Sequence, residues 1–467
     1  MHSRASATTA LPPLGLRVHF VGIGGAGMIG LARILLAQGY CVSGSDRSDS
    51  VALAMLRDLG ATTWVGHNAA YVGDARLVVM TAAVPAANVE VAAARARGIP
   101  VIKRAALLGS LANARRCIAV AGTHGKSTTS GMVAYILSRQ GVDPLFVIGA
   151  EVRDLGTSAR DGSGPLAVVE ADEYDYSFLQ LTPDVAVITN VEYDHPDIFP
   201  DAATYTAAFN QFVGQTRRGG TIILGADDPG CASLATSEGD DLHIETVGTL
   251  PTADWSITLG ADGTVTLAHL GEAVGTASLA VAGEHNTRNA AMAVAACAAV
   301  GIDPAIALRT VAAYRGVGRR FEVIGDASGV TVVDDYAHHP TEVRATLAAA
   351  RLRFPGRRLI AVFQPHTFSR TVRFVPEFAA ALDGADVALV TDIYAAREPD
   401  RGTVHARDIV RRMAAGRGDY TGSLDATVDA LAVRVRAGDV VLTLGAGDIT
   451  GVGPDLLGRL AAREAGA

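Results

Sequence analysis

The stretch that decides the fold reads Arg116-Cys-Ile-Ala-Val-Ala-Gly122-Thr-His-Gly-Lys126-Ser-Thr-Thr, and a helical pattern then runs to Gly141. Its apolar run over residues 118–121 has the length and composition of a buried strand. The glycines that follow let the backbone turn tightly and approach a ligand. Strand, glycine turn, Lys-Ser and helix are the layout of a phosphate-binding loop, whose N–H groups and helix N-terminus face an anion.

The match to the usual phosphate-loop pattern is incomplete. The pattern G-x-x-x-x-G-K-[ST] asks for glycine at position 120, where this chain has Val120, so the loop is a shortened G-x-x-G-K-S. A bare G-K-S arises often by chance, but this one follows a strand and opens a helix. We expect Lys126 to reach the β- and γ-phosphates and Ser127 to offer its hydroxyl to Mg²⁺. The alternative is a structural turn.

Composition narrows the class of protein. A chain of 467 residues corresponds to about three domains. A formal charge of −8 argues against a nucleic-acid partner or an anionic membrane surface. The four cysteines are scattered without a C-x-x-C pair, so neither a zinc site nor a disulfide framework is indicated. Without a membrane-length apolar run or a signal-peptide pattern, we expect a cytoplasmic protein with no membrane insertion; a homodimer is among the states that the sequence allows.

A second glycine loop lies near the N-terminus. An apolar run at residues 18–21 reads as a strand, and a helical pattern occupies residues 28–38. An acidic residue follows the glycines by about 20 positions, as in the dinucleotide fingerprint. Such a loop recognises a diphosphate, which NAD and a nucleotide-sugar both carry, so a dehydrogenase stays open at this point. The residues of this pattern are Gly22, Gly24, Gly25, Gly27 and Asp46.

Polar clusters end two later strands. Runs at residues 166–169 and 185–189 read as buried strands, and open α/β sheets place their ligands at the carboxyl ends of strands. Glu170-Ala-Asp-Glu173 follows the first run, and Asn190-Val-Glu-Tyr-Asp-His195 follows the second. Carboxylates and an imidazole there could ligate Mg²⁺ directly or through water. The alternative is that these acidic loops are simply solvated.

Two features precede the last third of the chain. Short alternating runs between residues 241 and 282 indicate a small antiparallel excursion. Asn286 and Asn289 then lie three apart on one face of an alanine-rich helix. Their amides offer both a donor and an acceptor, as an adenine edge requires, although helix capping explains them equally well.

The C-terminal part repeats the strand–helix alternation. Apolar runs at residues 330–333, 359–363, 387–390 and 440–444 predict a second doubly wound sheet after a hinge at residues 316–322. The first two of these runs end in Asp334-Asp-Tyr-Ala-His-His-Pro and Gln364-Pro-His-Thr-Phe-Ser-Arg. Consecutive histidines are poorly placed to bind one ion, so we favour substrate and nucleotide contacts over a metal site there.

The predicted fold is α/β with three domains. The first, residues 1–112, is expected to be Rossmann-like and to bind a ligand that carries a diphosphate. The second, residues 113–320, is expected to be a phosphate-loop ATPase domain with a mostly parallel sheet. The third, residues 321–467, is expected to be Rossmann-like.

Taken together, these motifs resemble the Mur ligases of peptidoglycan synthesis, and they run in family order across nearly the whole chain. The resemblance implies an ATP-dependent ligase with Mg²⁺ that joins L-alanine to the carboxylate of UDP-N-acetylmuramate through an acyl phosphate. The matching motifs are Gly22-Ile-Gly-Gly-Ala-Gly-Met28, Gly122-Thr-His-Gly-Lys-Ser-Thr128, Glu170-Ala-Asp-Glu173, Asn190-x-x-x-Asp194-His195, His285-Asn286-x-x-Asn289, Gly318-Arg-Arg-Phe321, Asp334-Asp-Tyr-Ala-His-His-Pro340 and Phe363-Gln-Pro-His-Thr-Phe-Ser-Arg-Thr371.

The resemblance also implies a role for each matching residue. Lys126 and Arg320 would be catalytic, because they would neutralise charge on the transferring phosphoryl group. Ser127, Glu170 and His195 would be the magnesium ligands. The first glycine loop with Asp46 would hold the UDP-sugar. Tyr336, His338, His366 and Arg370 would surround the alanine. The residues expected to bind ATP are Gly122, Thr123, His124, Gly125, Lys126, Ser127, Thr128, Asn286, Asn289, Arg320 and Asp335.

Two other functions remain as alternatives. A paralogous ligase would add a recycled L-Ala-γ-D-Glu-diamino acid tripeptide to the same UDP-sugar. An NAD-dependent dehydrogenase would use the first glycine loop but would leave Lys126, Glu170 and His195 without a role.

Overall fold

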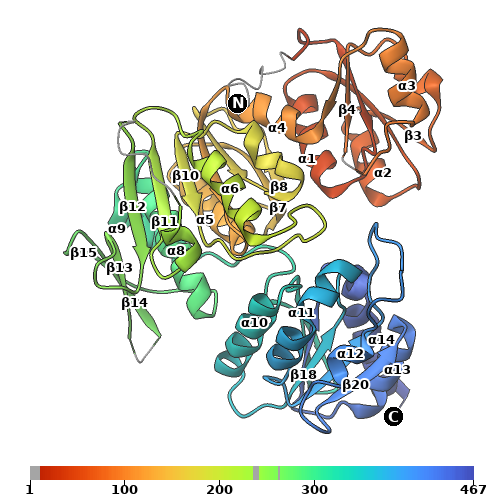
Figure 1. Ribbon diagram of the computed structural model, residues 1–467, viewed down its shortest axis with the longest axis vertical. Coiled ribbons are helices and arrows are strands. Elements are labelled where there is room, and N and C mark those ends of the chain that lie inside the picture. Colours follow the sequence, from red (N-terminus) through yellow and green to blue (C-terminus); the bar gives the residue numbers. More distant parts are fainter. Residues whose placement is uncertain (1–10, 82, 235–240, 261–262, 467) are drawn as a thin grey trace. The chain divides into compact units, whose positions relative to one another are not determined.

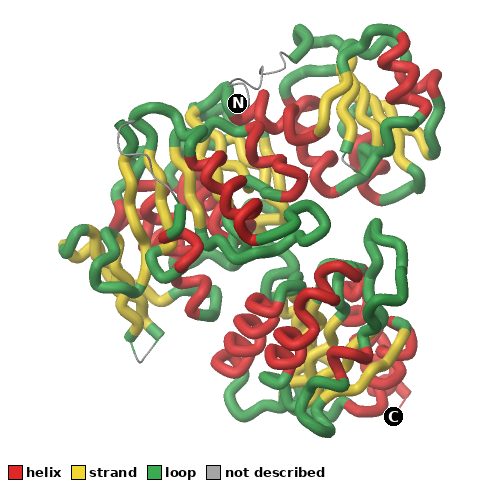
Figure 2. Tube along the Cα trace, in the orientation of Figure 1, coloured by secondary structure: helices red, strands yellow, loops and turns green. Residues whose placement is uncertain are grey.

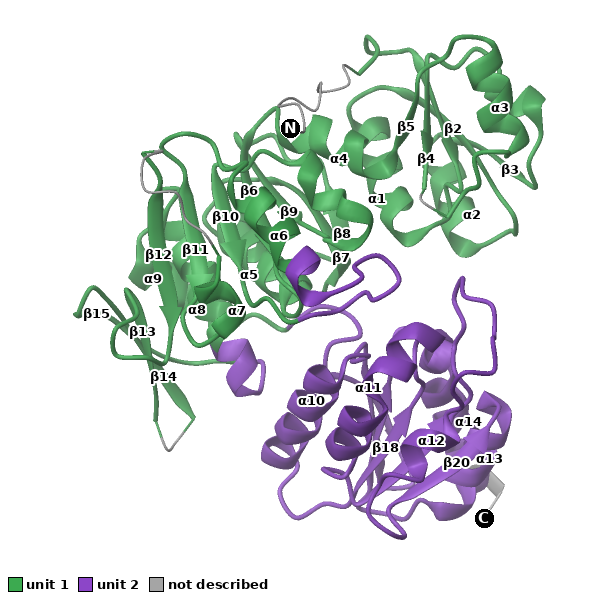
Figure 3. Ribbon diagram, in the orientation of Figure 1, with its two compact units in different colours: residues 1–192, 206–279, 288–315 green, residues 193–205, 280–287, 316–467 purple. Residues whose placement is uncertain are grey.

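The computed structural model describes residues 11–81, 83–234, 241–260 and 263–466, and it builds three sheets covered by helices (Figures 1 and 2). The predicted α/β class is confirmed. The first ten residues of the predicted N-terminal domain lie outside the described part. The chain divides into two compact units (Figure 3). Unit 1 comprises residues 1–192, 206–279 and 288–315, and unit 2 comprises residues 193–205, 280–287 and 316–467.

The first sheet of unit 1 is parallel throughout, in the order β3-β2-β1-β4-β5. The order reverses direction beside β1, which is where open sheets of this kind bind ligands. The first glycine loop leaves β1 at this position. The elements are β1 (Arg17–Val21), α1 (Ala26–Ala37), β2 (Cys41–Asp46), α2 (Val51–Asp58), β3 (Thr62–Val65), β4 (Leu77–Met80), α3 (Val89–Ala96), β5 (Val101–Lys103) and α4 (Arg104–Ala112).

The second sheet of unit 1 has ten strands, in the order β15-β14-β13-β12-β11-β10-β6-β9-β7-β8. It is parallel except for the pairs β7–β8, β13–β14 and β14–β15. Strand β6 lies between β10 and β9, so the loop after β6 meets the carboxyl ends of both. The strands are β6 (Arg116–Ala121), β7 (Leu145–Val152), β8 (Thr157–Arg160), β9 (Leu166–Glu170), β10 (Val185–Ile188), β11 (Thr221–Gly225), β12 (His243–Gly248), β13 (Trp255–Leu259), β14 (Thr264–His269) and β15 (Glu272–Ser278).

The helices of this sheet follow the predicted alternation. The helix after the phosphate loop is buried over most of its length, which fits the small side chains of its first turns and the mainly apolar run over residues 132–137. Strands β13 to β15 confirm the predicted antiparallel excursion. The helices are α5 (Lys126–Arg139), α6 (Ala202–Val213), α7 (Pro229–Ala232), α8 (Glu284–Ala298) and α9 (Pro304–Val311).

The sheet of unit 2 has the order β16-β17-β21-β18-β19-β20 and is parallel except at β16. Helices α10, α11 and α12 pack on one face, and α13 and α14 pack on the other. The elements are β16 (Glu322–Ala327), β17 (Val330–Asp335), α10 (Pro340–Arg353), β18 (Leu359–Phe363), α11 (Phe368–Leu382), β19 (Val387–Thr391), α12 (Arg407–Val410), β20 (Gly418–Gly422), α13 (Leu424–Arg434), β21 (Val440–Leu444) and α14 (Val452–Gly466). Across the described residues of both units, every helix is too short or too polar to cross a bilayer.

Candidate functional site

The phosphate loop joins β6 to α5 through two glycines with left-handed backbone. Gly122 has φ +130° and Gly125 has φ +83°. A Cβ atom on Gly122 would lie 2.0 Å from Thr189 Oγ1, and one on Gly125 would lie 2.6 Å from Asn289 Oδ1. Both positions therefore require glycine, for conformation and for space. Asn289 lies against the loop itself, a placement that its sequence position did not predict.

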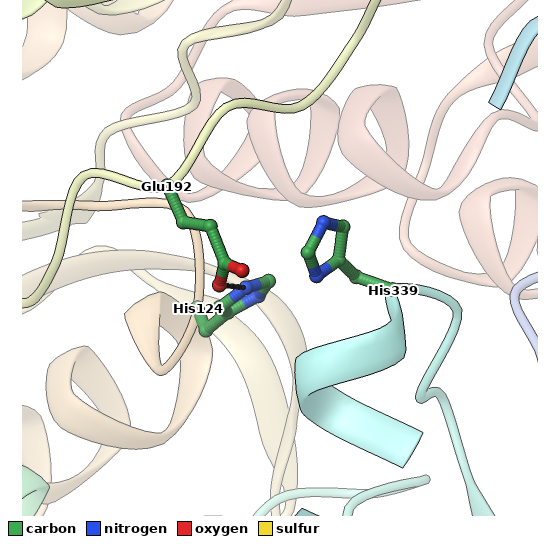
Figure 4. A group of neighbouring side chains, drawn as sticks. All are labelled: His124, Glu192 and His339. Carbon is green, nitrogen blue, oxygen red and sulfur yellow. Dashed lines mark hydrogen bonds and ion pairs between the residues drawn. The ribbon is translucent and has the colours of Figure 1, made fainter. Parts of the chain in front are cut away.

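Residues after β10 hold the phosphate loop in place. The Thr123 hydroxyl donates to the Glu192 carbonyl at 2.7 Å and accepts the Glu192 N–H at 2.9 Å. The Asn190 side chain accepts the His124 N–H at 2.9 Å and donates to the His124 carbonyl at 3.0 Å. The Glu192 carboxylate meets His124 Nε2 at 3.0 Å (Figure 4). The acidic segment predicted to bind magnesium thus serves, in part, to shape the loop.

The Lys126 ammonium contacts two carbonyls of its own loop and one buried carboxylate. Its Nζ donates to the carbonyls of Gly122 and Thr123 at 2.6 and 3.0 Å. The same Nζ lies 2.9 Å from Glu173 Oε2, whose side chain is fully buried. These partners occupy the three donors of an ammonium group. An arriving phosphate must therefore replace at least one of them.

Neighbouring carboxylates keep the Lys126 ammonium protonated. Burial lowers the pKa of this ammonium, but the negative charges of Glu173, Asp172 and Glu170 outweigh that effect, and the net shift is upward. Lys126 is consequently protonated across the physiological range. A partly buried cation near several carboxylates at a helix N-terminus is suited to a polyphosphate that arrives with a divalent cation.

Ser127 and Glu170 offer oxygen atoms of the kind that Mg²⁺ prefers. Ser127 is buried in the first turn of α5, and Glu170 ends β9. One carboxylate oxygen of Glu170 accepts the Gly149 N–H at 2.6 Å, which orients the group and leaves the second oxygen to a ligand. This donor set fits a magnesium ion bound through a hydroxyl, a carboxylate and water. The third expected ligand, His195, belongs to unit 2.

The first glycine loop is closed by Asp46 from the end of β2. The Asp46 carboxylate accepts the N–H of Gly24 at 2.8 Å and the N–H of Arg47 at 2.7 Å. A Cβ atom on Gly24 would lie 2.8 Å from Leu53 Cδ1 and 3.0 Å from Asp46 Oδ2. The structure therefore gives Asp46 a role inside the loop, while its predicted contact with the UDP-sugar stays a prediction.

A pocket in unit 1 links this loop to the end of β9. Its lining includes Ala26, Gly27, Arg104, Glu170 and Asp172. A Cβ atom on Gly27 would lie 3.1 Å from the Arg104 guanidinium, so glycine lets that cation approach the loop. The pocket thus has a positive group and glycine backbone at one end and carboxylates at the other. Two motifs that lie far apart in the sequence, the first glycine loop and Glu170, face one cavity.

In unit 2, Arg370 forms a buried ion pair with Asp194. Its Nε and Nη2 donate to the two Asp194 oxygens at 2.9 and 3.1 Å. Nη1 meets His366 Nδ1 at 3.1 Å and the His366 carbonyl at 3.3 Å, and Nη2 lies 3.4 Å from His195 Nδ1. All five N–H donors of the guanidinium are engaged. Arg370 therefore connects three segments, and a substrate carboxylate would have to displace or extend these contacts.

The histidines predicted around the amino acid gather beside this ion pair. The rings of His338 and His366 lie 6.0 Å apart in a T-shaped arrangement, and Tyr336 lies 5.3 Å from His338. Burial, together with the neighbouring His338 and Arg370, lowers the pKa of His366 to about 3. His366 is therefore neutral at physiological pH. The four residues predicted to contact the amino acid lie in one unit.

The Gly318-Arg-Arg-Phe turn brings two cations to the end of β17. The guanidinium groups of Arg319 and Arg320 lie 5.0 and 5.2 Å from the Tyr336 ring centroid. Arg320 Nη1 also donates to Glu342 Oε1 at 3.2 Å. Asp335 accepts the N–H groups of Phe321 and Ala337, and burial raises the pKa of its carboxyl to about 6. Both Asp335 oxygens thus accept backbone N–H groups, and the predicted contact of Asp335 with ATP stays a prediction.

Left-handed backbone marks the same region of unit 2. Four residues other than glycine have positive φ there: His195 at +54°, Arg319 at +57°, Phe321 at +50° and Thr367 at +67°. For a β-branched residue such as Thr367 this conformation is strained. Such strain persists only where surrounding contacts enforce it, and it is concentrated at functional sites. Thr367 is held by its N–H bond to the Tyr394 carbonyl at 2.8 Å.

The two predicted adenine contacts fall on different turns of α8. Asn286 donates to the Ala282 carbonyl at 2.7 Å, and Asn289 packs beside Gly125. Several contacts of the site were not predicted, although Glu173 and Glu192 belong to the acidic segments that were expected to bind magnesium. Glu173, Glu192, Glu342 and Tyr394 each contact a predicted site residue. The only local signal was their nearness in sequence to the motifs, because their contacts are made across the fold.

Comparison with family models places this arrangement among known proteins. Residues 17–116 match the model described as "Mur ligase family, catalytic domain", residues 120–297 match "Mur ligase middle domain", and residues 319–447 match "Mur ligase, glutamate ligase domain". These three segments contain the two glycine loops and the histidine cluster of unit 2.

Whole-chain comparisons agree with the family models. The UDP-N-acetylmuramate–L-alanine ligase of Thermobifida fusca is 44% identical over 456 residues, covering 94% of this chain and 96% of that protein. The ligase of the same name from Kineococcus radiotolerans is 47% identical, covering 96% and 97%. Among solved structures, the UDP-N-acetylmuramate–alanine ligase of Thermotoga maritima has a TM-score of 0.80 at 28% identity, covering 96% and 100%. A murein peptide ligase of Psychrobacter arcticus has a TM-score of 0.73 at 27% identity, covering 96% and 99%.

Proposed function

The chain belongs to the Mur ligase family, and we propose that it joins L-alanine to the carboxylate of UDP-N-acetylmuramate in the cytoplasm, converting ATP to ADP and phosphate. The observation that carries this proposal is the Gly122–Ser127 loop, which holds a partly buried, protonated lysine at the N-terminus of α5. A dehydrogenase has no use for such a lysine. A ligase needs it, because a carboxylate is a poor electrophile until it has been phosphorylated.

The first step would activate the sugar carboxylate. A carboxylate oxygen attacks the γ-phosphorus of ATP, the bond to the β–γ bridging oxygen breaks, and ADP leaves with that electron pair. Lys126 would neutralise charge on the transferring group from unit 1, and Arg320 is the cation that we assign to the same task from unit 2. Magnesium, when bound, would neutralise phosphate charge. Ser127 and Glu170 would hold it, and His195, the third proposed ligand, would first have to release its Nδ1 from Arg370 Nη2.

The substrates would occupy the sites that the motifs define. Gly22, Gly24, Gly25 and Gly27, closed by Asp46, would hold the diphosphate of the UDP-sugar, and Arg104 supplies a nearby cation. The sugar would then extend through the pocket toward Glu170. ATP would bind the proposed residues of the second loop, Gly122, Thr123, His124, Gly125, Lys126, Ser127 and Thr128, with Asn286, Asn289 and Asp335 around the nucleoside.

The amino acid would bind in unit 2 among Tyr336, His338, His366 and Arg370. Arg370 already pairs with Asp194, so an alanine carboxylate would share or replace those donors. His366 is neutral and its Nδ1 accepts from Arg370, which leaves its Nε2–H to donate to the substrate carboxylate. We keep the division into domains at residues 1–112, 113–320 and 321–467, one domain for each substrate.

The test is phosphate release by the purified full-length chain with ATP, MgCl₂ and UDP-N-acetylmuramate, with one amino substrate added at a time. We expect release with L-alanine and a product whose mass equals that of UDP-N-acetylmuramoyl-L-alanine. Faster release with L-Ala-γ-D-Glu-diamino acid would replace alanine by the tripeptide and keep the ligase chemistry. No release with either, together with substrate-dependent oxidation of NADH, would overturn the proposal.

A further inference from the structure

The hydrogen bonds of His366 fix its ring as a donor toward the site. A guanidinium has donors only, so the 3.1 Å contact of Arg370 Nη1 requires the lone pair to be on His366 Nδ1. The neutral ring therefore carries its proton on Nε2. A ring in this tautomer can donate a hydrogen bond to a substrate, but it has no lone pair left with which to accept a proton.

Two further histidines of unit 2 have the same tautomer. His195 Nδ1 lies 3.4 Å from Arg370 Nη2, which again can only donate. His339 Nδ1 accepts the Thr341 N–H at 3.4 Å and so forms the N-cap of α10. Each neutral ring then holds its proton on Nε2. None of these rings can take a proton from a substrate without first breaking the contact that orients it.

His338 has the opposite tautomer. Its Nδ1 lies 3.0 Å from the Tyr336 carbonyl, which can only accept, so Nδ1 carries the proton. Glu342 Oε2 lies 3.2 Å from the same nitrogen. The lone pair is therefore on Nε2, and no donor among the described residues of unit 2 is bonded to it. A carbonyl and a carboxylate that hold Nδ1–H fix the orientation and the tautomer of the ring, as in catalytic His–carboxylate pairs.

We propose that His338 Nε2 accepts the proton that the substrate ammonium must lose before it can attack, and that Glu342 is the positioning residue that holds the ring for this task. The inference rests on the proposed function, because it names the base for that reaction. It adds a catalytic residue among groups that the motifs alone describe only as contacts of the amino acid.

The proton balance of the step is complete. The alanine ammonium passes one proton to His338 Nε2 and becomes a neutral amine. The amine lone pair forms the C–N bond to the acyl phosphate carbon, and the C–O bond to phosphate breaks. The second amine proton leaves with the phosphate as hydrogen phosphate. His338 then returns its proton to solvent, so one turnover releases one proton.

The charged and titratable groups around His338 come from several elements. Glu342 lies on α10, and Tyr336 lies in the loop after β17. His366 follows β18 and contacts the His338 ring. His338 also lies close enough to Asp194, the partner of Arg370, to affect the pKa of that carboxyl. A positive charge formed on His338 is balanced by Glu342 and opposed by Arg370, whose own charge is paired with Asp194.

The test separates proton removal from every earlier step by changing the nucleophile. Hydroxylamine is uncharged at neutral pH and attacks an acyl phosphate without help from a base, giving a hydroxamate that forms a coloured complex with Fe³⁺. For His338→Gln we expect the rate with L-alanine to fall by about 10²- to 10⁴-fold, the usual contribution of a general base. We expect the hydroxamate rate without alanine to stay within about threefold, since acyl phosphate formation does not use this ring.

A pH profile gives a second reading that does not depend on hydroxylamine. The wild-type rate with saturating L-alanine should level off as the pH rises, as the rate of a reaction that uses a general base does. The rate of His338→Gln should keep rising by about tenfold per pH unit, because it depends on amine already neutralised in solution. Glu342→Gln should lower the alanine rate more than the hydroxamate rate, because it loosens the base and leaves acyl phosphate formation unchanged, which a purely structural effect would not do. His243→Gln, at an exposed position on β12, is the matched control and should change neither profile.

Two outcomes would overturn the assignment of His338. One is an equal loss of the alanine and hydroxylamine rates in His338→Gln, which would make the residue structural. The other is a pH profile of the variant with the same shape as that of the wild type. Failure of the proposed function looks different, because the wild-type protein itself would then release no phosphate with ATP, UDP-N-acetylmuramate and L-alanine.

Discussion

The two glycine loops of unit 1 leave parallel strands in the same way and differ in the charges that surround them. The first loop contains no charged residue; Asp46 accepts one of its N–H groups, and the nearest cation, Arg104, comes from α4. The second loop carries its own cation, Lys126, whose ammonium is held by two loop carbonyls and by Glu173. A neutral loop suits a diphosphate that is bound and not broken. A loop with a built-in cation suits a phosphoryl group whose charge is redistributed during transfer.

The largest effect that this comparison predicts is on Lys126. Lys126→Ala should lower kcat by about 10²- to 10³-fold, because the charge acts mainly on the transferring phosphoryl group. The KM for UDP-N-acetylmuramate should change little, since we assign that substrate to the other loop. Steady-state phosphate release with each substrate varied in turn measures both. Near-normal turnover at saturating ATP would remove the phosphate-loop assignment and with it the contrast between the loops.

The next effect concerns the carboxylate partner of this lysine. Glu173→Gln removes the buried negative charge and leaves the ammonium of Lys126 without its closest counterion. Breaking a buried ion pair in this way costs about 3–5 kcal/mol of stability. ATP should then restore more stability than it does in the wild type, because its phosphates replace the missing charge. Thermal unfolding with and without Mg-ATP measures this difference.

The variant Glu192→Gln is the matched control for Glu173→Gln, because it makes the same chemical change at another carboxylate beside the loop. Glu192→Gln removes a negative charge from the same face of the loop, but there the partner is His124, at 3.0 Å, and the Glu192 side chain is partly exposed. The stability of Glu192→Gln should fall much less than that of Glu173→Gln. The increase in its stability on adding Mg-ATP should equal that of the wild type. Equal behaviour of the two variants would mean that Lys126 is not the group that Glu173 stabilises.

A third effect belongs to the first loop. Gly24→Val places methyl groups where Leu53 and the Asp46 carboxylate already lie 2.8 and 3.0 Å from a Cβ position. The loop must shift, and the KM for UDP-N-acetylmuramate should rise by about tenfold or more, a cost of at least 1.4 kcal/mol. The KM for ATP should move much less. A larger rise for ATP than for the sugar would reverse the assignment of the two loops.

The sequence predicted the loops well because their information is local. Glycines, a lysine and a strand–helix change of period lie within about 26 residues in the second loop, so spacing alone indicates the geometry. Strands β3 and β20 were not predicted, since Thr62–Val65 and Gly418–Gly422 are short and carry exposed polar or glycine residues in place of an apolar run. Both are edge strands of their sheets.

The pairings of the site were harder to predict, because they join distant segments. Arg370 and Asp194 are 176 positions apart. Arg370 was predicted to contact the substrate, and Asp194 lies in a segment predicted to bind magnesium. In the structure the two side chains pair with each other. Glu192 lies in an acidic loop that looked like a metal site, yet its backbone and side chain hold Thr123 and His124. Residue type and strand position predict that a polar group lies at the site. Which neighbour it meets depends on the three-dimensional packing.

The smallest effect that we expect is that of Asp46→Asn in the first glycine loop, and it tests which contact the Asp46 carboxylate makes. Asp46→Asn keeps an oxygen that can accept the Gly24 N–H, so the loop should retain its shape, and only the charge is lost. A neutral acceptor in place of a carboxylate weakens such a bond by roughly 0.5–1 kcal/mol, or about two- to fivefold in affinity. Removing a negative charge beside a bound diphosphate also relieves repulsion, which offsets part of that loss. The KM for UDP-N-acetylmuramate should therefore change by less than about fivefold in either direction. If Asp46 instead grips a ribose hydroxyl of the substrate, Asp46→Asn should raise that KM by more than tenfold, and isothermal titration with UDP alone should show the same loss.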